Sequence, residues 1–112
     1  MQINLKGTEL TLTPALKVYV ESKLGSLAKF IKQFEREGET EMRVEIARTT
    51  RHHHRGPSVF RAEANLRLSG RVLRANQDDA DARAAIDKVK DKLQLEIEKY
   101  KTRLEKRSRG QK

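Results

Sequence analysis

The fold is decided by residues 60–68, which read Phe60-Arg61-Ala62-Glu63-Ala64-Asn65-Leu66-Arg67-Leu68. Apolar side chains occupy every second position, and this period of two predicts a β-strand with one buried face. The pair Ser69-Gly70 follows and is typical of a tight hairpin turn. Residues 71–76 then predict a second strand that runs back beside the first. The centre of the sequence is therefore expected to form a β-hairpin.

Two further strands are predicted on the N-terminal side of this hairpin. Residues 1–6 and residues 42–47 show the same alternation of apolar and polar side chains. The charged segment 35–41 and the polar segment 48–58 separate these strands from their neighbours and predict loops. Together with the hairpin they supply four strands.

Two helices are predicted from apolar residues spaced three or four positions apart. The first begins with Thr13 as N-cap and Pro14 at the first helical position. Its apolar stripe comprises Leu16, Val20, Leu24, Leu27 and Ile31. Gly25 lies within this helix and indicates a close packing contact, because glycine disfavours helix interiors. The second helix follows the aspartate-rich segment 78–81, whose carboxylates complement a helix N-terminus. Its stripe comprises Ala82, Ile86, Val89, Leu93, Ile97, Tyr100 and Leu104.

The element order β-α-β-β-β-α predicts a single α+β domain. We expect both helices to pack side by side on one face of a four-stranded sheet, with the other face open to solvent. A right-handed crossover through the first helix makes the first two strands parallel, and the remaining pairs are antiparallel. The domain is expected to span residues 1–105, and residues 106–112 to form a basic, disordered tail.

The chain of 112 residues is strongly basic, with 25 Lys and Arg against 16 Asp and Glu. Residues 43–77 carry eight basic and two acidic side chains, and residues 99–112 carry seven and one, so each region has a net charge of +6. Two positive regions on an otherwise balanced domain indicate a polyanion-binding surface. The exposed strand positions carry Arg, Glu and Asn instead of aromatic side chains. We therefore expect contacts with the phosphates of structured RNA, without base stacking.

The basic helix positions form the candidate RNA-binding site. On a helical wheel, the cations of the second helix form two strips, one on each side of the apolar stripe, and the first helix adds two more. Lysines that border a core can also cover it with their aliphatic stems, so the strips as sets are the stronger signal. The candidate RNA-binding residues are Lys23, Lys29, Arg83, Lys88, Lys92, Lys99, Lys101 and Arg103.

Other kinds of site are disfavoured by the sequence. The chain contains no cysteine, which removes disulfides, thiolate metal sites and cysteine nucleophiles. His52, His53 and His54 are consecutive, a spacing that does not suit a metal site, and we interpret them as part of a solvated basic loop. No glycine-rich phosphate loop or catalytic triad is present, so we expect no enzyme activity, cofactor or metal. No apolar run approaches the roughly 20 residues of a membrane span, and we expect a cytoplasmic protein.

Short motifs along residues 1–106 match a known family in order and spacing. They are Met1–Gly7, Leu12–Lys17, Lys23–Leu24, Phe60–Ala64, Ala85–Asp87, Lys92–Leu93 and Lys99–Leu104. In these motifs the chain resembles the ribosome hibernation promoting factors, also called ribosome-associated inhibitors or ribosomal subunit interface proteins. The resemblance implies a fold similar to that of double-stranded RNA-binding domains. It fits a short member of the family or the N-terminal domain of a long one, whose second domain pairs ribosomes.

The resemblance also implies a function and a partner. A protein of this family would bind 16S rRNA of the small ribosomal subunit and the 70S ribosome at the decoding region. It would occlude the tRNA and mRNA sites and stabilise idle ribosomes in stationary phase or stress, as a monomer off the ribosome and without a small-molecule substrate. The family's basic positions correspond to Lys23, Lys29, Lys92, Lys99 and Lys101.

This chain departs from the family pattern at two positions. Arg83 replaces a usual aromatic residue, and Ser26 replaces a common lysine. A different class of function remains open: a non-ribosomal interaction module that binds an acidic protein through its exposed sheet face.

Overall fold

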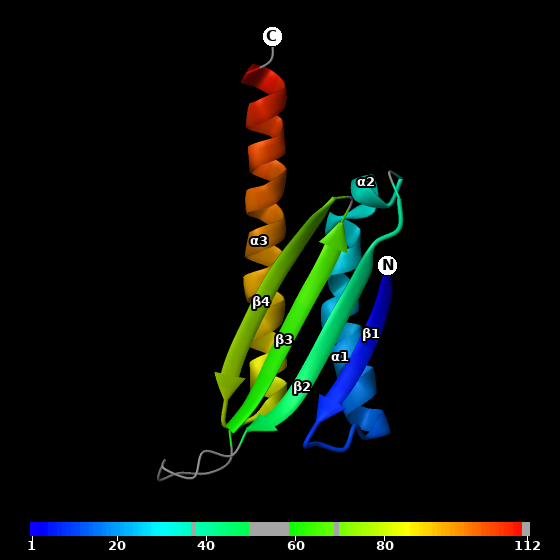
Figure 1. Ribbon diagram of the computed structural model, residues 1–112, viewed down its shortest axis with the longest axis vertical. Coiled ribbons are helices and arrows are strands. Elements are labelled where there is room, and N and C mark those ends of the chain that lie inside the picture. The colour runs from blue at the N-terminus through cyan, green and yellow to red at the C-terminus, as the bar shows by residue number, and fades with distance from the viewer. Residues whose placement is uncertain (37, 50–58, 69, 111–112) are drawn as a thin grey trace.

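The computed structural model describes residues 1–36, 38–49, 59–68 and 70–110 (Figure 1). One four-stranded sheet has the order β1 (Gln2–Thr8), β2 (Glu41–Thr49), β3 (Val59–Leu68) and β4 (Arg71–Asp79). β1 pairs in parallel with β2, and β3 pairs antiparallel with both β2 and β4. The helices cover one face of the sheet (Figure 1). The predicted α+β class, element order and strand pairing are confirmed.

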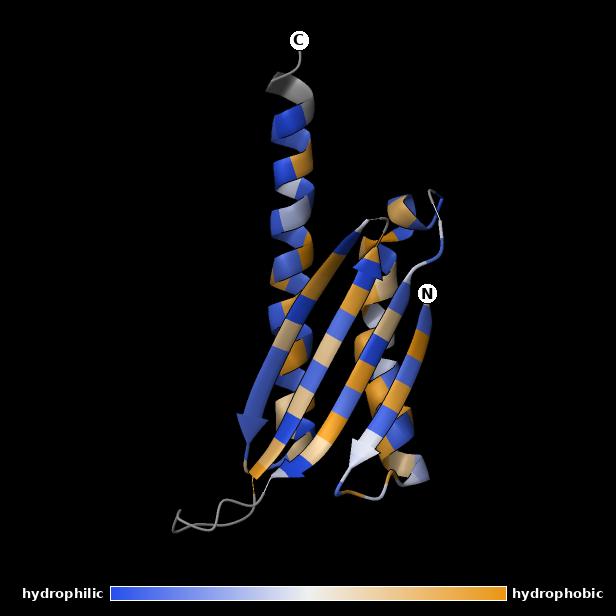
Figure 2. Cartoon of the chain, viewed as in Figure 1, coloured by the Kyte–Doolittle hydropathy of each residue, from blue (hydrophilic) through white to orange (hydrophobic). Residues whose placement is uncertain are grey.

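The β3–β4 hairpin supplies the centre of the core. Ala62, Ala64, Leu66 and Leu68 are at most 1% exposed, and the residues between them point to the open face. Figure 2 shows this alternation of apolar and polar positions along the strands. Leu68 pairs with Arg71 across the turn, and Gly70 has a φ of 70°, a left-handed conformation that glycine adopts without strain. Ser69 lies outside the described residues.

The first predicted helix is divided into three pieces. The α-helix α1 (Pro14–Gly25) is followed by the 3₁₀-helix η1 (Ser26–Phe30) and the short helix α2 (Lys32–Glu35). The Ser26 hydroxyl donates a hydrogen bond of 2.6 Å to the carbonyl of Lys23. Such a local bond competes with helix continuation, and Gly25 disfavours the helix next to it. The expectation of one continuous helix is therefore wrong, although its apolar stripe from Val20 to Ile31 is buried.

The long helix α3 (Ala82–Gly110) begins after a run of aspartates that belongs partly to β4. β4 continues to Asp79, three residues beyond the predicted end. Asp79 Oδ1 accepts a hydrogen bond of 3.0 Å from the backbone N–H of Asp81, and Asp81 Oδ1 accepts one of 3.1 Å from that of Arg83. The predicted role of these carboxylates at the start of the helix is confirmed for Asp79 and Asp81.

The C-terminal part of α3 extends beyond the sheet (Figure 1). Leu104 is the last residue that packs against the core, and the helix continues to Gly110. Residues 106–110, which we expected in a disordered tail, are therefore helical. Glu, Lys and Arg are good helix formers, and no proline interrupts this segment. The boundary of the domain at residue 105 stays a prediction.

Gly7 fixes the connection between β1 and α1. A Cβ atom at this position would lie 2.7 Å from the carbonyl oxygen of Leu10 and 2.9 Å from Cγ of Leu12. Both distances are shorter than a van der Waals contact, and the carbonyl belongs to the backbone and cannot rotate away. Gly25 differs, because the nearest atom to a Cβ there would be Cδ1 of Ile3 at 4.0 Å. The close contact expected at Gly25 is thus absent there and occurs at Gly7.

We expect Gly7→Ala to lower the free energy of unfolding by about 1–3 kcal/mol, the usual cost of overpacking. Gly25→Ala is the matched control, and we expect it to be neutral or to stabilise by up to about 1 kcal/mol, since its conformation is helical. Urea unfolding followed by circular dichroism measures both. Equal stability of the two variants would contradict the close contact at Gly7.

Candidate nucleic-acid interface

The candidate cations all lie on the helical layer, in two groups on opposite sides of α3. One group lies at the seam between α3 and α1–η1 and comprises Lys23, Arg83 and Lys101, and Lys29 lies nearby on η1 with its Nζ over the Phe30 ring. The other lies on the β4 side of α3 and comprises Lys88, Lys92, Lys99 and Arg103. Lys23 of α1 contacts Asp87 of α3, Lys101 contacts Phe30 of η1, and Lys92 contacts Asn76 of β4. Lys99 and Arg103 follow Lys92 at helical spacing and lie in line with it. The structure thus places candidate cations on both sides of α3, and their role in RNA binding stays a prediction.

Tyr19 organises the N-terminal half of the α1–α3 seam. Its hydroxyl donates a hydrogen bond of 2.6 Å to Oδ1 of Asp87, and Nζ of Lys23 lies 3.6 Å from the same oxygen. Nζ of Lys23 lies 5.7 Å from the centroid of the Tyr19 ring, and Cζ of Arg83 lies 5.1 Å from it. These distances suit cation–π attraction. One ring and one carboxylate thus position two of the candidate cations.

Asp87 raises the pKa of Tyr19 above its ordinary value. The main cause is the hydrogen bond that the carboxylate accepts from the neutral hydroxyl, followed by burial and by repulsion between the carboxylate and a tyrosinate. The folded protein therefore keeps this proton at a pH at which the unfolded chain loses it. At neutral pH the hydroxyl is protonated, and Asp87 remains the acceptor that joins α1 to α3.

Lys101 is held more firmly than the other candidates. Its Nζ donates a hydrogen bond of 2.7 Å to the carbonyl oxygen of Phe30, in a partly buried position. Phe30 is the last residue of η1, where carbonyl groups lack helical partners. The ammonium group therefore joins α3 to η1. Its role in RNA binding stays a prediction. Within the protein, this hydrogen bond stabilises the packing of α3 against η1.

The cations on the β4 side are held by weaker contacts. Nζ of Lys88 lies 2.5 Å from Oδ2 of Asp79, and Nζ of Lys92 donates a hydrogen bond of 3.1 Å to the carbonyl of Asn76, both in exposed positions. The bond from Lys88, together with the backbone N–H of Asp81, lowers the pKa of Asp79. Lys99 is 69% exposed and lies 3.5 Å from Glu96. Exposed contacts of this kind contribute little stability, so these ammonium groups can exchange their partners for phosphates.

Three candidate cations form neither an ion pair nor a side-chain hydrogen bond within the described part of the chain. They are Lys29, Arg83 and Arg103. Nζ of Lys29 lies 5.2 Å from the centroid of the Phe30 ring, which leaves its charge exposed to an anion. Arg103 borders a shallow surface formed with Leu95, Glu98, Lys99 and Thr102. Their charges require no exchange of partner before an anion binds.

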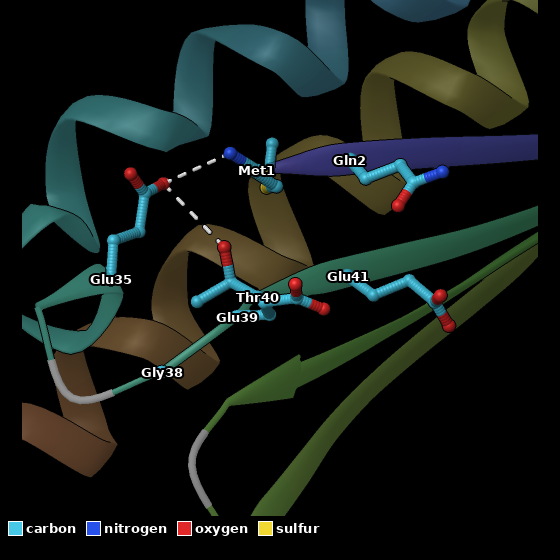
Figure 3. A pocket seen from close by; sticks show the side chains of 7 residues that line it. All are labelled: Met1, Gln2, Glu35, Gly38, Glu39, Thr40 and Glu41. Atoms are coloured by element: carbon cyan, nitrogen blue, oxygen red, sulfur yellow. Dashed lines mark hydrogen bonds and ion pairs between the residues drawn. The ribbon is translucent and has the colours of Figure 1, made fainter.

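A concave surface at one edge of the sheet does not suit a polyanion. It lies where β1, the end of α2 and the start of β2 meet (Figure 3), and is lined by Met1, Gln2, Glu35, Gly38, Glu39, Thr40 and Glu41. The α-ammonium group of Met1 lies 3.2 Å from Oε1 of Glu35, so its charge is already paired. Three glutamates make this pocket acidic.

The remaining site expectations concern metals and membranes. The described residues contain no group of three His, Asp or Glu side chains placed to hold a metal ion. His52, His53 and His54 lie outside those residues. None of the described helices combines the length and apolarity required to cross a bilayer.

Sequence reasoning missed the contacts that join the two helices. The carboxylate of Asp87 on α3 contacts Tyr19 and Lys23 of α1. The signal was present in two places: Asp87 lies in a family motif, and Arg83 replaces an aromatic residue beside it. A guanidinium over the Tyr19 ring is the consequence of that replacement in this chain.

The fold and the two cation strips define the class of protein. It is a small α+β domain with one helical layer, and that layer carries a basic surface of the kind that binds polyanions. Residues 3–105 match the family described as Sigma 54 modulation protein / S30EA ribosomal protein. This chain belongs to that family.

Relatives and solved structures agree with this assignment. The chain is 36% identical over 104 residues to a ribosome hibernation promotion factor of Deinococcus radiodurans, covering 92% of this chain but only 51% of the relative. It is 32% identical to a ribosome hibernation promoting factor of Azotobacter vinelandii, covering 99% of this chain and 92% of the relative. The chain thus spans about half the length of the Deinococcus protein and most of the Azotobacter protein.

The N-terminal domain of Protein Y from Thermus thermophilus has a similar structure, with a TM-score of 0.71 and 31% identity over 89% of this chain and 99% of that one. A ribosomal subunit interface protein from Coxiella burnetii has the same fold, with a TM-score of 0.70 and 22% identity over 91% of this chain and 99% of that one.

We expect Lys101→Met to lower the free energy of unfolding by about 1–3 kcal/mol, because the partly buried carbonyl of Phe30 loses its donor. Lys92→Met is the matched control; its ammonium group is exposed, and we expect a change within about 0.5 kcal/mol. Urea unfolding measures both. If the two variants are equally stable, the bond from Lys101 to η1 does not hold the helices together.

Asp87→Asn is expected to move the pKa of Tyr19 down toward the ordinary value of about 10. The titration is followed by tyrosinate absorbance in a Tyr100→Phe background, which leaves Tyr19 as the only tyrosine. In the parent background the bond to Asp87 stabilises the fold fully below a pH of about 10 and is lost as the pH rises through the raised pKa of Tyr19. Identical titrations with and without Asp87→Asn would exclude this bond.

Proposed function

We propose that this protein binds the small ribosomal subunit, and the 70S ribosome that contains it, through phosphates of 16S rRNA at the decoding region. The bound domain blocks the tRNA and mRNA sites and stabilises idle ribosomes in stationary phase or stress. It acts in the cytoplasm as a binding protein that inhibits translation without catalysing a reaction, and it is a monomer off the ribosome. Membership of a family that includes ribosome hibernation promotion factors supports this proposal.

The observation that carries the proposal is the strip on the β4 side of α3. Lys88, Lys92, Lys99 and Arg103 follow one side of a rigid helix, and their contacts within the protein are exposed and weak. A row of cations with this spacing attracts a phosphate backbone and releases its counterions on binding. Because the strip contains no exposed aromatic side chain, it recognises charge and shape instead of base identity.

The rival function is binding of an acidic protein through the open face of the sheet. That face carries cations and carboxylates in nearly equal number, and several are already paired. Arg43 lies 2.9 Å from Glu41, and Arg61 lies 2.9 Å from Asp78. Glu45 also lies directly opposite Glu63 on the next strand, where an acidic partner would be repelled. These contacts favour the helical layer over the open face as a whole.

We expect the Lys92→Glu and Lys99→Glu double variant to bind small ribosomal subunits roughly ten- to a hundredfold more weakly, because each reversal replaces attraction to phosphate with repulsion. Both side chains are exposed and lie outside the core, so thermal melting should change little. Co-sedimentation with 30S and 70S particles on sucrose gradients measures the binding.

The control for this experiment is the double variant Lys17→Glu and Lys32→Glu, which makes the same change in net charge at exposed positions of α1 and α2. We expect it to lose less affinity. Equal losses in the two double variants would show that the strip on α3 is not the contact surface. Recovery of the parent protein only at the top of the gradient would overturn the ribosomal proposal and favour the rival function.

A further inference from the structure

Another group of cations, separate from the two groups on the helical layer, lies at the edge of the sheet formed by β4. We call it the arginine edge and define it as Arg67 of β3 and Arg71 and Arg74 of β4. All three side chains are exposed. They belong to the basic region 43–77, whose excess charge the helical strips do not explain. None of the three belongs to the motifs that the chain shares with its family.

The arginine edge presents charge on both faces of one edge strand. Arg74 and Val72 point to the open face, and Arg67 lies directly opposite Val72 on the neighbouring strand. Arg71 alternates with them and points to the helical side, in phase with the buried Leu73 and Ala75. A chain that lies along this edge therefore meets cations from both sides of the sheet.

The edge is continuous with the strip on α3. Cζ of Arg71 lies 5.4 Å from the centroid of the Tyr100 ring. Tyr100 directly follows Lys99, and Arg103 is three residues further along the same helix, where side chains are neighbours. Arg71 thus joins β4 to the C-terminal half of the candidate RNA-binding strip.

The charges of the arginine edge are not neutralised by neighbours. Among the described residues, Arg67, Arg71 and Arg74 form no ion pair, whereas Arg43 and Arg61 on the same sheet pair with Glu41 and Asp78. The carboxylate nearest in register to Arg67 is Glu41, which is already bound by Arg43. An external anion is therefore the partner that this group lacks.

We infer that the arginine edge binds a second stretch of RNA backbone, so that RNA contacts continue from the strip on α3 around the edge of β4. This inference rests on the proposed function. Guanidinium groups bind phosphate oxygens with two parallel hydrogen bonds, which suits a backbone contact. A protein partner is less suitable, because a protein interface needs an apolar centre and Val72, at 42% exposure, is the only large exposed apolar side chain among these strand residues.

The chain contains no cysteine, so single cysteines can carry a benzophenone cross-linker. We expect Val72→Cys, at the arginine edge, to cross-link to 16S rRNA in complexes with purified small ribosomal subunits. Leu95→Cys on α3, whose parent side chain is 54% exposed beside Lys99 and Arg103, reports on the proposed function in the same assay. Gln2→Cys, on the opposite edge strand β1, is the control and should give no RNA cross-link.

The outcomes separate the two proposals. RNA cross-links from both Val72→Cys and Leu95→Cys support the inference. An RNA cross-link from Leu95→Cys alone, with Val72→Cys linked to a ribosomal protein or to nothing, overturns the inference and leaves the proposed function standing. If no variant co-sediments with subunits, the proposed function fails and the inference fails with it.

A charge experiment tests the same surface without a cross-linker. We expect Arg67→Gln with Arg74→Gln to weaken binding to small subunits about tenfold and to reduce the slope of log K against log salt by about 2, roughly 1 for each phosphate contact. Arg43→Gln with Arg61→Gln removes the same charge from paired positions of the same face, and we expect a smaller loss. Equal effects in the two pairs would show that the arginine edge attracts RNA only through net charge, which overturns the inference.

Discussion

The central strand β3 buries only one of its two faces, and the arrangement of the whole molecule depends on this constraint. β3 pairs with a strand on each side, so its backbone is satisfied within the sheet and its side chains must form the core. Because Ala62, Ala64, Leu66 and Leu68 all point the same way, both α1 and α3 must cover that face. The charged residues are then left on the outer side of the helices, on the open face and at the strand edges, which are the surfaces available to a partner.

Patterns that repeat with a fixed period were predictable from the sequence. The alternation in the strands and the three-to-four spacing in α3 gave the class, the order and the pairing of the elements. Single-residue effects were not predictable, because they depend on competition between local and tertiary contacts. At the break after Gly25, the Ser26 hydroxyl donates a hydrogen bond to the Lys23 carbonyl. The close contact at Gly7 arises because the chain brings Leu10 and Leu12 back against this residue.

The candidate site was predictable only as a distribution of charge. A helical wheel places Lys88, Lys92, Lys99 and Arg103 on one side of α3 without any knowledge of the sheet. It cannot show that Tyr19 bonds to Asp87, 68 residues away, or that Lys101 bonds to the Phe30 carbonyl, 71 residues away. Those contacts form only when α1–η1 and α3 lie together on the sheet.

The intramolecular partners of each cation determine how it can contribute to binding. If a phosphate binds the Lys101 ammonium group, the Phe30 carbonyl loses its donor. The cost of losing this hydrogen bond then offsets part of the binding free energy. Lys99 loses only an exposed contact with Glu96, and the three members of the arginine edge give up no ion pair. Affinity for a polyanion should therefore depend most on the exposed, weakly held cations, while Lys23 and Lys101 at the α1–α3 seam keep the helices in the register that presents them.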